Sequence, residues 1–159
     1  MPITPSPPTD DSVDPLIGTA DEVADMMLAC TLPKRRWTHE GHVLACVSLT
    51  LRHGAAEALG LLRTAIPRYN NLTGVENTTT SGYHDTLTVY YVWAVDRLLE
   101  RGCDVAAVLA NDTVDRRAAL AWWDADTLFS AAARARFVAP HLAGDGGPSP
   151  SEPVAQGTR

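Results

Sequence analysis

Apolar residues recur three or four positions apart along most of the chain, which is the spacing of one face of an α-helix. The first such stripe consists of Val23, Met26, Met27 and Cys30. Thr19 and Glu22 form a capping-box pattern ahead of this stripe, and Pro33 is expected to end the helix. The pattern therefore predicts a first helix that is capped by Thr19.

Two further helices are expected to follow directly. Thr38 is a good N-cap for a helix over residues 39–53, and Gly54 would close it. The third helix carries a stripe that consists of Ala55, Leu59, Leu62 and Ile66. Pro67 lacks a backbone N–H, so we expect it to disturb the end of this helix.

The second half of the chain begins with a loop, because the segment NNLTGVENTTTSG is rich in Asn, Thr and Gly. Ser81 is the expected cap of a long helix over residues 82–101, and shorter helices are expected near 105–111, 113–123 and 126–138. The segment TLTVYYVW favours a strand by composition, but it also fits a helical stripe. No stretch alternates cleanly, so we predict an all-α fold, a compact bundle of about five to seven helices.

Composition sets the domain limits. Residues 1–16 are Pro-rich and residues 144–159 are rich in Gly, Pro and Ser, so both are expected to be disordered tails around one helical domain at 17–143. The chain is 45% hydrophobic and 20% charged, and its apolar runs are too short to span a bilayer. Its start lacks a secretory signal, and its three cysteines lack C-x-x-C spacing, so we expect a cytoplasmic protein.

Charge argues against a nucleic-acid partner. The chain carries a net charge of −6, and the single basic cluster, Lys34-Arg35-Arg36, is short enough to be a solvated turn. The expected partner is a small-molecule substrate, and the apolar helix faces would allow a homodimer.

Three of the five histidines suggest a common site. On a helical wheel, His39 and His42 lie about 60° apart, whereas Glu40 lies about 100° and 160° from them. In the long helix, His84 shares a face with Thr88, Tyr91, Val95 and Leu98. Two helices that turn these N-terminal ends inward would bring His39, His42 and His84 together.

Three converging imidazoles predict a divalent transition-metal site for Cu, Fe or Zn with an open coordination position. Asp85 or Glu40 could then act as a general base or orient an imidazole, and Tyr91 could reach a bound ligand. Asn77 and Thr78 could bind substrate. The alternatives are structural: histidines at helix starts often cap or pack, and loop Asn and Thr side chains often satisfy only the backbone of a turn.

Three segments resemble a family of small, largely uncharacterised bacterial proteins: LPKRRWTHEGHVLACVSLTLRHG, IPRYNNLTGVENTTTSGYHDTLT and LFSAAARARFVAPHL. The family pattern contains W-T-H-x-x-H-L and G-Y-H-E-T, and the likeness covers about residues 25–142. It points to one site that consists of His39, His42, Asn77, Thr78, Tyr83 and His84. This chain has Asp85 where the family has Glu and Val43 where it has Leu, and the shorter carboxylate of Asp85 reaches less far toward a metal.

Four functions are consistent with these residues. The first is a metal-dependent enzyme of small-molecule metabolism that uses the three histidines for oxidative or Lewis-acid chemistry. The second resembles the HD-type phosphohydrolases, with His42, His84-Asp85 and Asp124 in loosely matching order. The third is a metal-free isomerase or cyclase in which His84 and Asp85 or Glu40 move protons. The fourth is a helical module that binds a small ligand without catalysis.

Overall fold

A computed structural model describes residues 14–142 and 144–151, and within them all regular structure is helical. The α-helices are α1 (Ile17–Leu28), α2 (His39–His53), α3 (Ala55–Leu72), α4 (Asp85–Glu100), α5 (Val105–Leu109), α6 (Ala125–Leu128) and α7 (Ala131–Ala135). The 3-10 helices are η1 (Lys34–Arg36), η2 (Asp112–Val114) and η3 (Ala118–Ala121). The predicted all-α class is confirmed.

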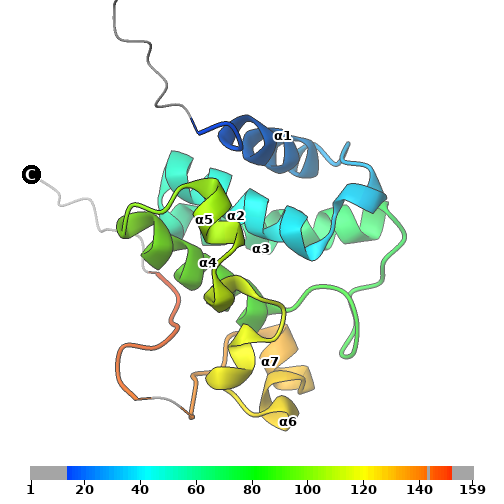
Figure 1. The fold of residues 1–159 in the computed structure, drawn as a ribbon. Helices are drawn as coiled ribbons and strands as arrows, with labels where there is room; N and C mark the ends of the chain where they lie inside the picture. The colour runs from blue at the N-terminus through cyan, green and yellow to red at the C-terminus, as the bar shows by residue number, and fades with distance from the viewer. Residues whose placement is uncertain (1–13, 143, 152–159) are drawn as a thin grey trace, which may run out of the picture.

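Helix α2 lies at the centre of the fold. It packs against α1, α3, α4 and α5, while α1 and the α6–α7 pair lie at opposite ends of the molecule (Figure 1). Residues 43–50 of α2 are all buried, as expected for a helix with neighbours on every side. The predicted limits of this helix are confirmed. The side chain of Thr38 accepts a hydrogen bond from the Gly41 N–H at 3.1 Å, and Gly54 ends the helix at φ +83°.

The predicted capping box of the first helix is wrong. Helix α1 begins at Ile17 with Leu16 as its N-cap, so Thr19 lies inside the helix. The start is fixed from upstream by Asp14, whose carboxylate accepts from the Leu16 N–H at 3.0 Å and from the Val105 N–H at 2.6 Å. These bonds satisfy a helix-start donor and tie the beginning of α1 to that of α5, which no local capping pattern could indicate.

Helix α3 continues beyond Pro67 to Leu72, so the prediction that proline disturbs its end is also wrong. Proline removes one backbone donor, but buried side chains before and after Pro67 hold the last turns of the helix together. Ile66, Tyr69 and Asn70 are all buried, and the Tyr69 hydroxyl donates to the carbonyl oxygen of Leu32 at 2.7 Å. Tertiary contacts therefore override the local preference.

Helix α4 begins later than predicted, because its cap is His84 and not Ser81. The Nδ1 atom of His84 accepts from the Leu87 N–H at 3.2 Å. Ser81 belongs to the preceding turn, where its hydroxyl donates to the Glu76 carbonyl oxygen. Gly82 has φ +79°, which lies outside the helical region. The histidine therefore sits at the helix entry as its N-cap, and it still lines the same cavity as Thr88 and Tyr91 of α4.

The C-terminal third is more broken than predicted. The helices expected near 113–123 and 126–138 are η2 with η3 and α6 with α7, each only a few residues long. Residues 144–151 lie within the described structure, where Pro148 is buried and Gly147 lies against Trp122. The rest of both predicted tails, at 1–13 and 152–159, lies outside the described residues, as does residue 143. No helix in the described part is long and apolar enough to cross a membrane.

Replacement of Gly82 by Ala should be costly. An added Cβ would lie 2.5 Å from the Glu76 carbonyl oxygen and 2.7 Å from Asn77 Oδ1, at a φ that side chains rarely adopt. We expect Gly82→Ala to lower the free energy of unfolding by about 2–3 kcal/mol in urea denaturation. Gly74→Ala is the matched control, since it has φ +83° but no neighbour within 4 Å, and it should cost about 1 kcal/mol. Equal losses would show that the close approach at Gly82 is unimportant.

Candidate functional site

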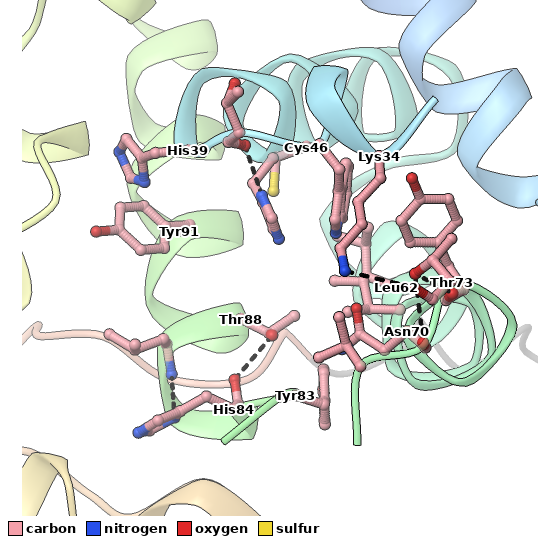
Figure 2. A pocket seen from close by; sticks show the side chains of 18 of the residues that line it. Lys34, His39, Cys46, Leu62, Asn70, Thr73, Tyr83, His84, Thr88 and Tyr91 are labelled. Atoms are coloured by element: carbon pink, nitrogen blue, oxygen red, sulfur yellow. Dashed lines mark hydrogen bonds between the residues drawn. The ribbon is translucent and has the colours of Figure 1, made fainter. Parts of the chain in front are cut away.

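A pocket of about 610 Å³ lies between the first turn of α2, the end of α3 and the start of α4 (Figure 2). This volume is within the range of small-molecule sites. Helix η1 and the loop between α3 and α4 complete its walls. Its lining is Lys34, Trp37, Thr38, His39, His42, Cys46, Leu62, Ile66, Tyr69, Asn70, Thr73, Val75, Gly82, Tyr83, His84, Leu87, Thr88, Tyr91 and Arg116. The three histidines named by the sequence therefore all reach one cavity.

His42 presents a neutral imidazole to this cavity. Its Nδ1–H donates to the Thr38 carbonyl oxygen at 2.7 Å, and the ring stacks on Trp37 with centroids 3.7 Å apart. The donor at Nδ1 fixes the tautomer, so Nε2 carries a lone pair. The pKa of His42 is lowered to about 4, mainly by burial. The bond to Thr38 acts in the opposite direction, and the nearby His39 adds a smaller lowering effect. His42 is therefore uncharged at neutral pH, and Nε2 has no hydrogen-bond partner among the described residues.

His39 and Tyr91 form a pair on another wall. The Nε2–H of His39 donates to the Val114 carbonyl oxygen at 2.7 Å, which leaves Nδ1 as an acceptor. The His39 ring lies edge-on to Tyr91, with centroids 5.2 Å apart. The Tyr91 hydroxyl donates to the carbonyl oxygen of Asp115 at 2.9 Å, and burial raises its pKa well above the usual value. Tyr91 thus contributes its ring to the cavity while its hydroxyl is bonded to the chain.

His84 lies in the wall but has both ring nitrogens occupied. Nδ1 accepts from Leu87 as the α4 cap, and the Nε2–H donates to the Leu128 carbonyl oxygen at 2.7 Å. The residue is only 7% exposed, and burial lowers its pKa. The described structure therefore leaves no nitrogen of His84 available to a metal ion.

The predicted three-histidine set does not fit a metal in this arrangement. Besides the occupied nitrogens of His84, the described residues contain no group of three His, Cys, Asp or Glu side chains that could hold a metal ion. Cys46 also lines the pocket, but burial raises the pKa of its thiol to about 12, so it stays protonated at neutral pH.

Asp85 lies outside the pocket, where its buried carboxylate pairs with the partly exposed Arg63. Its carboxylate accepts from Arg63 Nε and an Arg63 Nη atom, both at 2.9 Å, from the Tyr83 hydroxyl at 2.6 Å and from the Phe137 N–H at 2.9 Å. Burial alone would raise the pKa of Asp85, but the bonds from Arg63 and Tyr83 outweigh it and hold the pKa below the usual value. Asp85 therefore serves to join helices rather than to take up a proton in the pocket.

The other predicted acids are also away from the cavity. Glu40 is exposed and is absent from the pocket lining, in agreement with its position on the helical wheel. Asp124, which the phosphohydrolase reading requires, caps α6 and pairs with His141 at 2.7 Å. The structure thus brings none of the three carboxylates to the cavity that all three histidines line, although Glu40 shares a smaller second pocket with His39.

Asn77 and Thr78 hold the loop together. Asn77 Oδ1 accepts from the Tyr83 N–H at 2.9 Å and from Asn70 Nδ2 at 3.0 Å, and Asn77 Nδ2 donates to the Pro67 carbonyl oxygen at 3.0 Å. Thr78 Oγ1 accepts from the Ser81 N–H at 3.1 Å. Neither residue lines the pocket, whereas Tyr83 does. Asn77 and Thr78 therefore stabilise the loop itself, which is the structural alternative to substrate binding.

Sequence reasoning missed three basic residues. Lys34 and Arg116 line the pocket. Lys34 is exposed, as expected of a solvated turn, but its side chain also borders the cavity. Arg63, the partner of Asp85, follows Leu62 on α3 and borders the apolar stripe of that helix. The position of Arg63 beside this core-facing stripe was the only sign in the sequence that its side chain has a structural role. That position does not identify Asp85 as its partner.

Comparison with known proteins adds no assignment: no protein family, curated protein or solved structure matches this chain. The resemblance to small bacterial proteins stays a prediction.

The buried carboxylate should matter for stability. Asp85→Asn keeps the shape of the side chain but leaves Arg63 without its counter-charge, so we expect a loss of about 2 kcal/mol in urea denaturation at pH 7. The expected loss is smaller than for a fully buried ion pair because the Arg63 side chain is 39% exposed. Since the folded pKa of Asp85 is lowered, its contribution is present above the unfolded pKa and disappears as the pH falls through the folded pKa.

Asp25→Asn is the matched control, because Asp25 accepts from Arg52 at 2.8 Å but is 60% exposed. It should cost at most about 0.5 kcal/mol. The structural role of Asp85 is refuted if both variants lose the same free energy of unfolding at neutral pH. It is also refuted if the loss of stability in Asp85→Asn stays unchanged in acid.

Proposed function

We propose that the pocket binds a small organic molecule and that Nε2 of His42 accepts a hydrogen bond from it. The observation that carries this proposal is the lone pair of Nε2, which belongs to a ring that lines a ligand-sized cavity and has no partner within the described structure. Burial keeps the ring uncharged, and the bond to Thr38 fixes its tautomer. The nitrogen is therefore a permanent acceptor, ready for a donor that the ligand supplies.

The remaining lining favours a mostly apolar ligand. Trp37, Tyr69 and Tyr83 contribute aromatic rings, and Leu62, Ile66 and Leu87 contribute aliphatic surface. Pockets of this composition bind ligands by burial of apolar area and use a few polar groups to fix orientation. His42 is the polar group that is best placed to do so.

This arrangement favours ligand binding over proton transfer. A base with a pKa near 4 is a weak proton acceptor at neutral pH. Neither His84, with two occupied nitrogens, nor Asp85, with an arginine partner, is available as a base. The helical ligand-binding module is therefore better supported than the isomerase or the phosphohydrolase.

The test is a thermal-shift screen of small aromatic and heterocyclic compounds, followed by titration of each hit against Trp fluorescence. His42→Phe keeps a ring that can stack on Trp37 but removes the acceptor, and we expect it to raise the Kd of such a hit about tenfold. His53→Phe on the exposed end of α2 is the control and should leave the Kd unchanged. The proposal fails if no compound stabilises the wild-type protein, or if His42→Phe binds every hit equally well.

A metal-dependent enzyme is the second candidate, because one specific observation favours it. Nδ1 of His39 and Nε2 of His42 both lack partners among the described residues, and both rings line the same pocket. A divalent transition metal such as Cu, Fe or Zn could use these two nitrogens, and water or a bound molecule would have to supply the other ligands, because the described residues offer no third His, Cys, Asp or Glu.

Metal analysis of the untagged protein after reconstitution tests this candidate. Near-stoichiometric metal in the wild type and in His53→Ala, with loss in His39→Ala and His42→Ala, would support it. Retention of metal in both pocket variants would place the metal elsewhere, and a wild type that takes up no metal would remove the candidate.

A further inference from the structure

Most of the pocket's own hydroxyl donors are already used by the chain. Five of the six lining hydroxyls donate to protein oxygens, and they belong to Tyr69, Thr73, Tyr83, Thr88 and Tyr91. The sixth, Thr38, accepts from the Gly41 N–H, and no described residue accepts its own hydrogen. The charged side chains therefore supply most of the donors that remain for a ligand.

The charged side chains of the lining are both cations. Lys34 and Arg116 line the cavity, and no Asp or Glu does, although the whole chain carries a net charge of −6. A cavity with low-dielectric walls and charges of one sign attracts an ion of the opposite sign. The local charge thus opposes the overall charge of the protein and favours an anionic group in the ligand.

Lys34 is the cation that reaches into the cavity. Its ammonium group donates to the Thr73 carbonyl oxygen at 3.4 Å, and Figure 2 shows the side chain crossing from η1 toward the end of α3. An ammonium has three donors, so two are left for a ligand. Arg116 lies on the other side of the pocket, since its neighbour Asp115 accepts from the Tyr91 hydroxyl.

The position of Lys34 is set by close packing of η1 against α2. A Cβ added to Gly41 would lie 2.5 Å from the Arg36 carbonyl oxygen, so only glycine permits this approach. Trp37 follows directly and stacks on His42. One short segment therefore brings the ammonium donor and the neutral imidazole acceptor to the same cavity.

We propose that the ligand is an organic anion, an aromatic or cyclic carboxylate that also carries a hydroxyl or N–H donor. This inference rests on the proposed ligand-binding function. The carboxylate binds the Lys34 ammonium, the donor binds Nε2 of His42, and the ring lies on the apolar lining, while Arg116 adds attraction across the opening. A carboxylate fits better than a phosphate because a single ammonium reaches inward, whereas phosphate sites usually combine several N–H donors.

The probes are a hydroxynaphthoate, the matching naphthoate without the hydroxyl and the matching naphthol without the carboxylate. Each is titrated against the full-length wild type, Lys34→Gln and Arg35→Gln by fluorescence. Arg35→Gln is the matched control, because it removes the same charge from η1 but does not line the pocket. We expect the wild type to bind the hydroxynaphthoate about tenfold more tightly than either partial probe.

Lys34→Gln should remove the roughly tenfold advantage of the carboxylate and leave the Kd of the naphthol unchanged, while Arg35→Gln should change no Kd more than about twofold. The inference is overturned if the naphthol binds the wild type as tightly as the hydroxynaphthoate, or if both charge variants weaken the acid equally. The inference is also overturned if the only compounds whose binding depends on His42 are uncharged. In that case the proposed ligand-binding function would still stand. If no compound at all binds the wild type, both fail together.

Discussion

The buried carboxylate of Asp85 joins parts of the chain that are distant in sequence. It binds Arg63 of α3, the Tyr83 hydroxyl just before α4 and the Phe137 N–H after α7. A carboxylate that is 5% exposed must be matched by donors, because an unpaired buried charge costs several kcal/mol. Three segments are therefore held at one point, and the pocket wall at Tyr83 takes its position from that point. The pocket depends on a residue that does not line it.

Most polar atoms around the cavity are likewise bonded to other parts of the chain. His84 caps α4 with one nitrogen and holds the Leu128 carbonyl oxygen with the other, while Asn77 bonds Tyr83, Asn70 and Pro67. These residues give the pocket its shape and have little bonding capacity left for a ligand. Recognition then rests on the few groups that the fold leaves unsatisfied, and rigidity of the surrounding wall improves their precision.

Local signals were sufficient for the fold class and for α2, where Thr38 and Gly54 mark both ends. They failed where tertiary contacts decide: Asp14 starts α1 from upstream, and buried neighbours carry α3 through Pro67. The pattern correctly gathered His39, His42 and His84 around one cavity. It could not show that His84 would be fully bonded or that Asp85 would meet Arg63, because those partners lie more than twenty residues away.

The α4 entry also has a consequence for the order of events during synthesis. Thr86 donates to the Ala133 carbonyl oxygen and accepts from the Val138 N–H, and His84 is bonded to Leu128. Helices α1 to α4 can emerge from the ribosome and pack before any of these C-terminal groups has been made. A nascent chain of that length would carry the pocket's histidines but not the bonds that fix one of its walls. This wall of the cavity can therefore take its final form only after the segment that contains Leu128, Ala133 and Val138 has been made.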